Sequence, residues 1–206
     1  MRIIFVRHGQ TKWNLAGRYQ GQTDTELSSL GFAQACCLAK HFPVQEKISA
    51  IYSSDLTRAA QTAEVLARSF ACEMHLSQAM RELNFGRWEG LTRQQMEAEW
   101  PELATRFFVC PEKETPPEGE SFSCVQKRAM AEIKGLQERW RGNKNIVVVA
   151  HGAVLRAVLA ACLHIPLKYV WSIRQDNTAV SIVRFEPEIC YVELLNSTAH
   201  LQFLER

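Results

Sequence analysis

The chain has 206 residues, of which 47% are hydrophobic, and its 24 Lys and Arg residues nearly balance its 22 Asp and Glu residues, leaving a formal net charge of +2. A general nucleic-acid binder would carry a basic surplus to neutralise phosphates, and a disordered chain would combine high net charge with few apolar residues. The composition excludes both classes, and the length predicts one globular domain with a full hydrophobic core.

The first structural signal is a continuous apolar run at residues 3–6, rich in branched side chains. Such a run is typical of a strand that is buried on both faces, as in parallel sheets. An arginine follows it directly, so the segment is too short for a signal peptide or a membrane span. Residues 31–42 then predict a helix with Ser28 as its N-cap, and residues 49–54 predict a second strand.

The middle of the chain predicts a helix, an irregular segment and a loop. Residues 56–70 form the predicted helix, with Asp55 as its N-cap. Residues 81–100 carry a short amphipathic helix that ends before Pro101, and residues 110–119, with three prolines, predict a loop. We therefore expect an insertion over the edge of a sheet.

The last third of the chain contains the clearest helix pattern. Residues 121–140 have an apolar residue at every third or fourth position, the period of one helix face. Residues 146–150 predict another buried strand, and residues 178–185 and 189–194 predict two late strands. Strands that alternate with helices predict an α/β protein with three layers, α/β/α, around a doubly wound, mostly parallel sheet with helices on both faces.

The seven cysteines form an odd set without a C-x-x-C pair. This argues against a disulfide framework and against a zinc site. We expect reduced cysteines in the core of a soluble, cytoplasmic protein that has no membrane partner and no nucleic-acid partner.

Two His-Gly pairs follow predicted strands: His8-Gly9 and His151-Gly152. In a doubly wound sheet, ligands bind at the carboxyl ends of the strands, so we expect both pairs in one cleft. One such histidine by itself is more often a core or capping residue. Two at equivalent strand ends favour a functional site.

Two arginines accompany these histidines. Arg7 precedes His8, and Arg58 lies in the first turn of a predicted helix, where the helix dipole favours anions. Guanidinium groups bind phosphate oxygens in pairs, and a neutral imidazole can attack phosphorus. A metal site is the competing use of two histidines, but the His-Gly corners contain no carboxylate to complete a ligand set. We therefore expect phosphoryl transfer without a metal or a cofactor, on a small phosphate monoester.

Further motifs extend this pattern along the chain. They are Arg7-His8-Gly9, Gly17-Arg18-Tyr19-Gln20-Gly21, Ser53-Ser54-Asp55-Leu56, Arg81-Glu82, Trp88-Glu89-Gly90, Gly119-Glu120-Ser121 and Ala150-His151-Gly152. Together they resemble the signature of the histidine phosphatase superfamily, in its phosphoglycerate mutase-like branch, over nearly the whole chain. The resemblance implies a single domain over residues 1–206, with an insertion over the active site at about 83–120.

The resemblance also implies a role for each site residue. His8 would be the nucleophile that takes the phosphoryl group, and Glu82 would be the general acid and then the general base. Arg7, Arg58 and His151 would hold the three equatorial phosphoryl oxygens. The phosphate-binding set would also include Asn14, Gln20, Gly21 and Gly152.

Positions 82 and 10 both bear on the expected activity. The residues alone do not distinguish Glu82 from its neighbour Glu89; the apolar side chains after Glu82 suit a general acid, and the family pattern favours it. Position 10 is Gln, where the family usually has Glu. We expect activity to survive this difference, because no catalytic group is lost.

The spacing of the motifs bears on the reaction. Only 36 residues, 83–118, separate Glu82 from Gly119-Glu120-Ser121, and this compact form resembles the α-ribazole phosphatases and broad-specificity phosphatases. The leading hypothesis is a phosphatase acting on a small phosphate monoester, with α-ribazole 5′-phosphate as one candidate. A cofactor-dependent phosphoglycerate mutase and a non-catalytic phosphate-binding protein are the alternatives. Both a monomer and a homodimer stay open.

Overall fold

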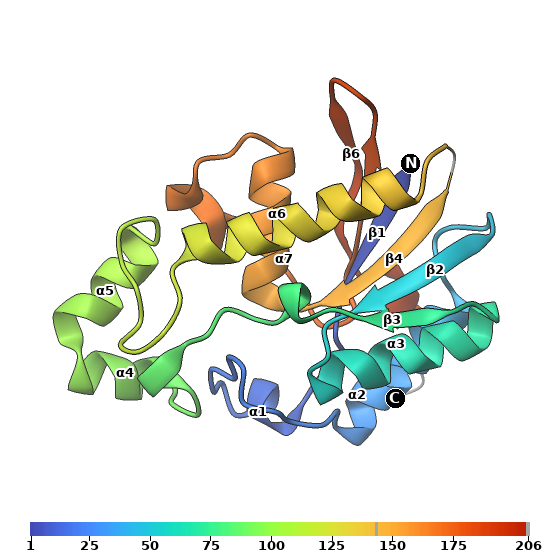
Figure 1. Cartoon of the computed structure of the whole chain (residues 1–206). Helices are drawn as coiled ribbons and strands as arrows, with labels where there is room; N and C mark the ends of the chain where they lie inside the picture. The colour runs from blue at the N-terminus through green and yellow to red at the C-terminus, as the bar shows by residue number, and fades with distance from the viewer. Residues whose placement is uncertain (143, 205–206) are drawn as a thin grey trace.

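The computed structural model describes residues 1–142 and 144–204. At its centre lies a six-stranded sheet in the order β3-β2-β4-β1-β5-β6 (Figure 1). The strands are β1 (Arg2–Arg7), β2 (Ile48–Ser53), β3 (Met74–Leu76), β4 (Asn145–Ala150), β5 (Val180–Phe185) and β6 (Cys190–Ser197). The pairs β3–β2, β2–β4 and β4–β1 are parallel, whereas β5 is antiparallel to both β1 and β6. The predicted mostly parallel sheet is confirmed.

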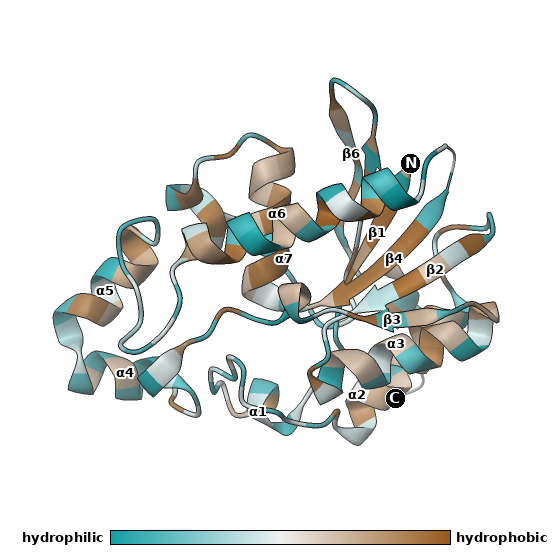
Figure 2. Ribbon diagram, in the orientation of Figure 1, coloured by the Kyte–Doolittle hydropathy of each residue, from teal (hydrophilic) through white to brown (hydrophobic). Residues whose placement is uncertain are grey.

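Helices cover both faces of this sheet (Figure 1). The helices α2 (Ser29–Lys40) and α3 (Thr57–Phe70) pack on one face, and α6 (Phe122–Arg139) and α7 (Gly152–Cys162) on the other. Figure 2 shows the apolar residues gathered in the strands between these layers and along α7. The predicted three layers are confirmed. None of the helices in the described residues is long and apolar enough to cross a membrane.

The pleat of the strands explains how both layers are held. On β1, Ile3 and Phe5 pack into the core beneath α6 and α7, and Ile4 and Val6 into the core beneath α2 and α3. In the register of β1 with β4, the last residue of β1 lies opposite the last residue of β4. The two strands therefore end together, and the His-Gly pairs that follow them begin side by side.

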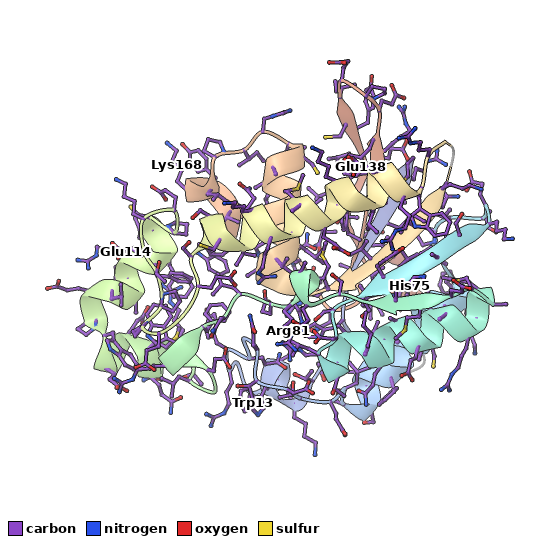
Figure 3. All side chains as sticks on the ribbon, viewed as in Figure 1. Trp13, His75, Arg81, Glu114, Glu138 and Lys168 are labelled. Carbon is purple, nitrogen blue, oxygen red and sulfur yellow. The ribbon has the colours of Figure 1, made fainter. Side chains whose placement is uncertain are left out.

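The helix starts agree with the sequence at α2 and differ at α3. The Ser28 side chain accepts a hydrogen bond from the backbone of α2, as predicted. Asp55 does not cap α3. The carboxylate of Asp24, from a distant loop, accepts from the backbone N–H of Thr57 at 2.7 Å instead. Asp55 pairs with Arg81, which is labelled in Figure 3 and donates from Nε and Nη2 at 2.7 and 2.6 Å.

Residues 83–120 lie beyond the carboxyl ends of the strands rather than along an edge strand (Figure 1). The predicted short helix is α4 (Arg93–Glu99), and a second helix, α5 (Pro101–Val109), begins at the proline, whose missing N–H is tolerated in a first turn. Glu114, which lies in the predicted loop and is labelled in Figure 3, accepts a hydrogen bond from Arg106 on α5 at 2.9 Å. The remaining elements are α1 (Lys12–Leu15), η1 (Gln78–Met80), η2 (Gly86–Trp88), η3 (Leu167–Ser172) and η4 (Ala199–Phe203).

All seven cysteines are free thiols, in line with the expectation of no disulfide framework. The expected burial is correct for Cys37 and Cys162, whereas Cys72, Cys110 and Cys190 are half-buried. It is wrong for Cys36 and Cys124, which are exposed. Both stand on the solvent-facing sides of α2 and α6, where a small residue has no packing role.

Candidate active site

A cavity of about 230 Å³ opens where the parallel strands end. Eight of the nine site residues predicted from the sequence line it: Arg7, His8, Asn14, Gln20, Gly21, Arg58, Glu82 and Gly152. The ninth, His151, is fully buried and lies against His8, with 5.1 Å between the two ring centroids. The structure therefore brings the whole predicted set together.

The ring of His8 is held in one tautomer. Its Nδ1 atom lies 2.7 Å from the carbonyl oxygen of Gly9, which can only accept a hydrogen bond, so Nδ1 carries the proton. Burial, together with the charges of Arg58 and Arg7, lowers the pKa of His8 well below 6.5. At neutral pH the ring is therefore uncharged, and its Nε2 has a free lone pair.

The loop that carries His8 packs closely against the start of α2. A Cβ atom on Gly9 would lie 2.5 Å from the carbonyl oxygen of Gly31, and one on Gly31 would overlap the carbonyl of Gln10. From the other side, Asn177 donates its side-chain N–H to the His8 carbonyl at 3.0 Å. The backbone around His8 is fixed from two directions.

His151 is a buried polar side chain without a partner. In the part of the chain that the structure describes, neither of its ring nitrogens makes a hydrogen bond. Burial, followed by the charges of Arg58 and other neighbours, lowers its pKa well below 6.5. A buried polar group without a partner is costly, which makes the ring a ready donor for a ligand.

Arg7 and Arg58 are each anchored by backbone carbonyls. Arg7 donates from Nη1 to Gln175 at 2.6 Å, and Arg58 donates from Nη1 and Nη2 to Thr23 and Gly21 at 2.9 and 2.7 Å. The Nε of each arginine is buried and has no partner among the described residues. Burial lowers the pKa of each guanidinium to about 10, so both stay cationic at neutral pH.

Glu82 is held by the first turn of α7. Its carboxylate accepts from the backbone N–H groups of Ala153 and Val154 at 3.0 and 3.1 Å, the favourable position for an anion at a helix N-terminus. Glu89 is engaged elsewhere, because its carboxylate accepts from the backbone N–H groups of Gln22 and Thr23, both at 2.8 Å. Only Glu82 of the two lines the cavity.

Gln10 lies outside the set that lines the cavity. Its backbone N–H donates to Gln34 at 2.9 Å, and its side-chain oxygen lies 3.3 Å from the Ser28 hydroxyl. The side chain therefore contributes to the contact with α2.

In the described residues, no group of three or more His, Cys, Asp or Glu side chains is arranged to hold a metal ion.

Two charged residues that line the cavity, Arg18 and Arg156, were not predicted from the sequence as site residues. Arg18 is exposed and donates to the carbonyl oxygen of Gly90. Arg156, on α7, lines the cavity beside Trp171 and Phe85. In the sequence it stands out only as an interruption of a long apolar run. The spacing would have revealed it once that run is recognised as a helix, because Arg156 lies four residues after Gly152 and so on the same face.

The site joins two uncharged imidazoles, two anchored guanidinium groups and a carboxylate at the strand ends of an α/β sheet. Free donors that converge on a small cavity suit a tetrahedral oxyanion such as a phosphoryl group. The fold and the cavity thus define a class: α/β proteins with a histidine-containing phosphoryl site at the carboxyl edge of the sheet.

Comparisons with known proteins agree with this class. The model of the histidine phosphatase superfamily (branch 1) matches residues 3–198. Phosphoserine phosphatase 1 of Hydrogenobacter thermophilus is 33% identical over 202 residues, which cover 98% of this chain and 94% of that protein. The structure of Bacillus stearothermophilus YhfR is similar with a TM-score of 0.90 and 30% identity, covering 97% of this chain and 98% of that one.

A structure described as a putative alpha-ribazole-5'-P phosphatase from Escherichia coli has a TM-score of 0.85 at 27% identity, and covers 97% of each chain. The protein belongs to the histidine phosphatase superfamily, and within it the chain is a phosphatase. The family and the fold class that the motifs imply are both confirmed.

Proposed function

We propose that the protein hydrolyses a small phosphate monoester in two steps through a phosphohistidine on His8. The observation that supports this most is the state of the His8 ring: Nδ1 is bound to the Gly9 carbonyl, and the ring is uncharged at neutral pH. A lone pair on Nε2 is therefore available beside two anchored cations. These are the conditions for a nitrogen nucleophile to attack an anionic phosphoryl group.

In the first step, Nε2 of His8 forms a bond to phosphorus, and the ester P–O bond breaks with its electron pair moving to the leaving oxygen. Glu82 gives that oxygen its proton. Arg7, Arg58 and His151 donate hydrogen bonds to the phosphoryl oxygens, where charge is concentrated in the transition state. The rest of the phosphate pocket is formed by Asn14, Gln20, Gly21 and Gly152.

In the second step, the carboxylate of Glu82 takes a proton from a water molecule, whose oxygen attacks phosphorus. The P–N bond breaks, its electrons return to the His8 ring, and inorganic phosphate leaves. Glu82 ends this step protonated and ready for the next ester. One carboxylate thus serves as acid and then as base.

The size of the site supports a small leaving group. A cavity of about 230 Å³ is below the roughly 300 to 1,000 Å³ of pockets that enclose larger ligands. We infer that residues 83–120 form an insertion that walls this cavity within a single domain, since Phe85 of this segment lines it. Phosphoserine and α-ribazole 5′-phosphate, the substrates named for similar proteins, are candidates.

The proposal is tested with p-nitrophenyl phosphate. The wild-type protein should release p-nitrophenol and phosphate, and His8→Ala should lower kcat/KM by at least about 1,000-fold because the nucleophile is lost. His75→Ala, on a half-buried histidine of the edge strand β3 outside the cavity (Figure 3), is the matched control and should keep wild-type activity. A wild-type protein that releases no phosphate from any ester, or an active His8→Ala variant, would contradict the proposal.

A further inference from the structure

Arg156 stands in the cavity with no role in the phosphoryl chemistry above. It lies on α7, one turn after Gly152. Its Nε donates to the carbonyl oxygen of Ile173 at 2.7 Å, and its guanidinium carbon lies 5.4 Å from the centre of the Trp171 ring. A carbonyl and an aromatic face therefore fix the plane of the group.

The outer nitrogens of Arg156 have no hydrogen-bond partner within residues 1–142 and 144–204. They also stand close to another cation. A Cβ atom built on Gly152 would lie 2.9 Å from Nη1 of Arg156 and 3.6 Å from Nε of Arg7. Two guanidinium groups thus flank the same point and repel each other, and an anion bound there would relieve the repulsion.

The charges of the site require more than one anionic group. Arg7, Arg58, Arg156 and the exposed Arg18 contribute four positive charges to a cavity whose lining holds a single carboxylate, Glu82. Under the proposed mechanism Glu82 is protonated when the ester binds. A phosphoryl dianion then balances two of the four cations, so positive charge is left for a second anionic group.

The position of Arg156 indicates where the second anionic group lies. Tyr19, Phe85 and Trp171 form an aromatic wall of the same cavity. Arg156 lies between Trp171 of this wall and Gly152, next to the strand ends where the phosphoryl group binds. A group that contacts Arg156 while the phosphorus atom lies against His8 is therefore part of the leaving alcohol.

We propose that Arg156 binds a carboxylate of the leaving alcohol, so that the preferred substrates are phosphate monoesters of small hydroxy acids. A fixed guanidinium presents two parallel N–H donors, which match the two oxygens of a carboxylate. This inference rests on the proposed phosphatase function. It names a substrate class and the residue that selects it.

Two matched pairs of esters test the inference. 3-Phosphoglycerate differs from glycerol 3-phosphate only by a carboxylate in place of a hydroxymethyl group, and phosphoserine differs from phosphoethanolamine by its carboxylate. The wild-type protein should favour the carboxylate member of each pair by about 10- to 100-fold in kcat/KM, the effect of a hydrogen-bonded charged group. Equal kcat/KM values within both pairs would overturn the inference.

Two variants assign the preference to Arg156. Arg156→Met keeps a long side chain against Trp171 but removes the charge, and it should lower the carboxylate preference to within about 3-fold of unity. Arg156→Lys keeps the charge without the paired donors and should give an intermediate preference. Arg68→Met, on the exposed face of α3, is the matched control and should retain the full preference.

The outcomes separate this inference from the proposed function. No hydrolysis of any ester, p-nitrophenyl phosphate included, would overturn the phosphatase mechanism itself. Hydrolysis of all esters with an unchanged carboxylate preference in Arg156→Met would overturn only the role of Arg156. A wild-type kcat/KM for α-ribazole 5′-phosphate, which has no carboxylate, above the values for phosphoserine and 3-phosphoglycerate would do the same. Should Arg156→Met fail to fold, the preference of Arg156→Lys decides the question.

Discussion

The nucleophile loop depends on two glycines that approach each other closely. The Cα of Gly9 faces the carbonyl of Gly31, and the Cα of Gly31 faces the carbonyl of Gln10. A side chain at either position would push the loop away from α2. Because His8 lies within this loop, a methyl group at Gly31 would alter the site as well as the packing.

We expect Gly31→Ala to lower the free energy of unfolding by about 1 to 3 kcal/mol, the usual effect of overpacking, and to lower kcat. Gly135→Ala, inside α6, is the matched control. Among the described residues, no atom beyond the helix's own backbone lies within 4 Å of the position that its methyl group would occupy, so this change should raise stability by about 0.5 to 1 kcal/mol. Urea denaturation measures both, and equal effects of the two changes would contradict the close packing of the loop.

Some residues of the site could be predicted from the sequence and others could not. His8 and His151 were predictable because each follows a short apolar run that is typical of a buried strand. Asp55 looked like the cap of α3, yet the cap comes from Asp24, 33 residues before Thr57. A contact between distant segments leaves no local pattern, so the sequence reading could not choose between them.

Among the elements, α6 has a second task besides covering the sheet. Its Arg128 donates to the carbonyl oxygens of Ala79, Arg81 and Glu82 at 2.7, 2.8 and 3.0 Å. Glu120, from the Gly-Glu-Ser motif, accepts from the same arginine at 2.8 and 2.9 Å. The helix thus fixes the backbone that presents the proposed acid to the cavity.

Arg128→Met should therefore disturb the position of Glu82. Hydrolysis of an alkyl ester such as glycerol 3-phosphate needs the acid and should fall about 10- to 100-fold in kcat. Hydrolysis of p-nitrophenyl phosphate, whose leaving group departs without a proton, should fall much less. Arg139→Met, at the other end of α6, is the control and should change neither rate. Equal losses on both esters would contradict a role in positioning the acid.

Two elements, β3 and α7, were not predicted from the sequence, each for its own physical reason. The strand β3 has only three residues, too few to show a pattern. The helix α7 is buried along nearly its whole length, so apolar residues occur on every side and no helical period stands out. This helix can be recognised only once the layers around it are known. The place of Arg156 in the cavity follows from the same knowledge.

At the scale of the whole molecule, a net charge of +2 conceals a concentrated cationic site. The parallel pairing of β1 with β4 brings two chain segments, more than 140 residues apart, to the same edge of the sheet. Four arginines and two uncharged histidines meet there around a single carboxylate. Although the total charge is near neutral, the local charge suits a small anionic ester.

Formation of phosphohistidine at His8 is tested most directly in a Glu82→Gln variant mixed rapidly with p-nitrophenyl phosphate. The first step needs no acid for this ester, but the second step lacks its base. We expect a burst of about one p-nitrophenol per site, and peptide mapping after an alkaline quench should find the phosphate on His8. Neither signal should occur in the His8→Ala, Glu82→Gln double variant. Turnover without a burst or label, or a label on another residue, would contradict the mechanism.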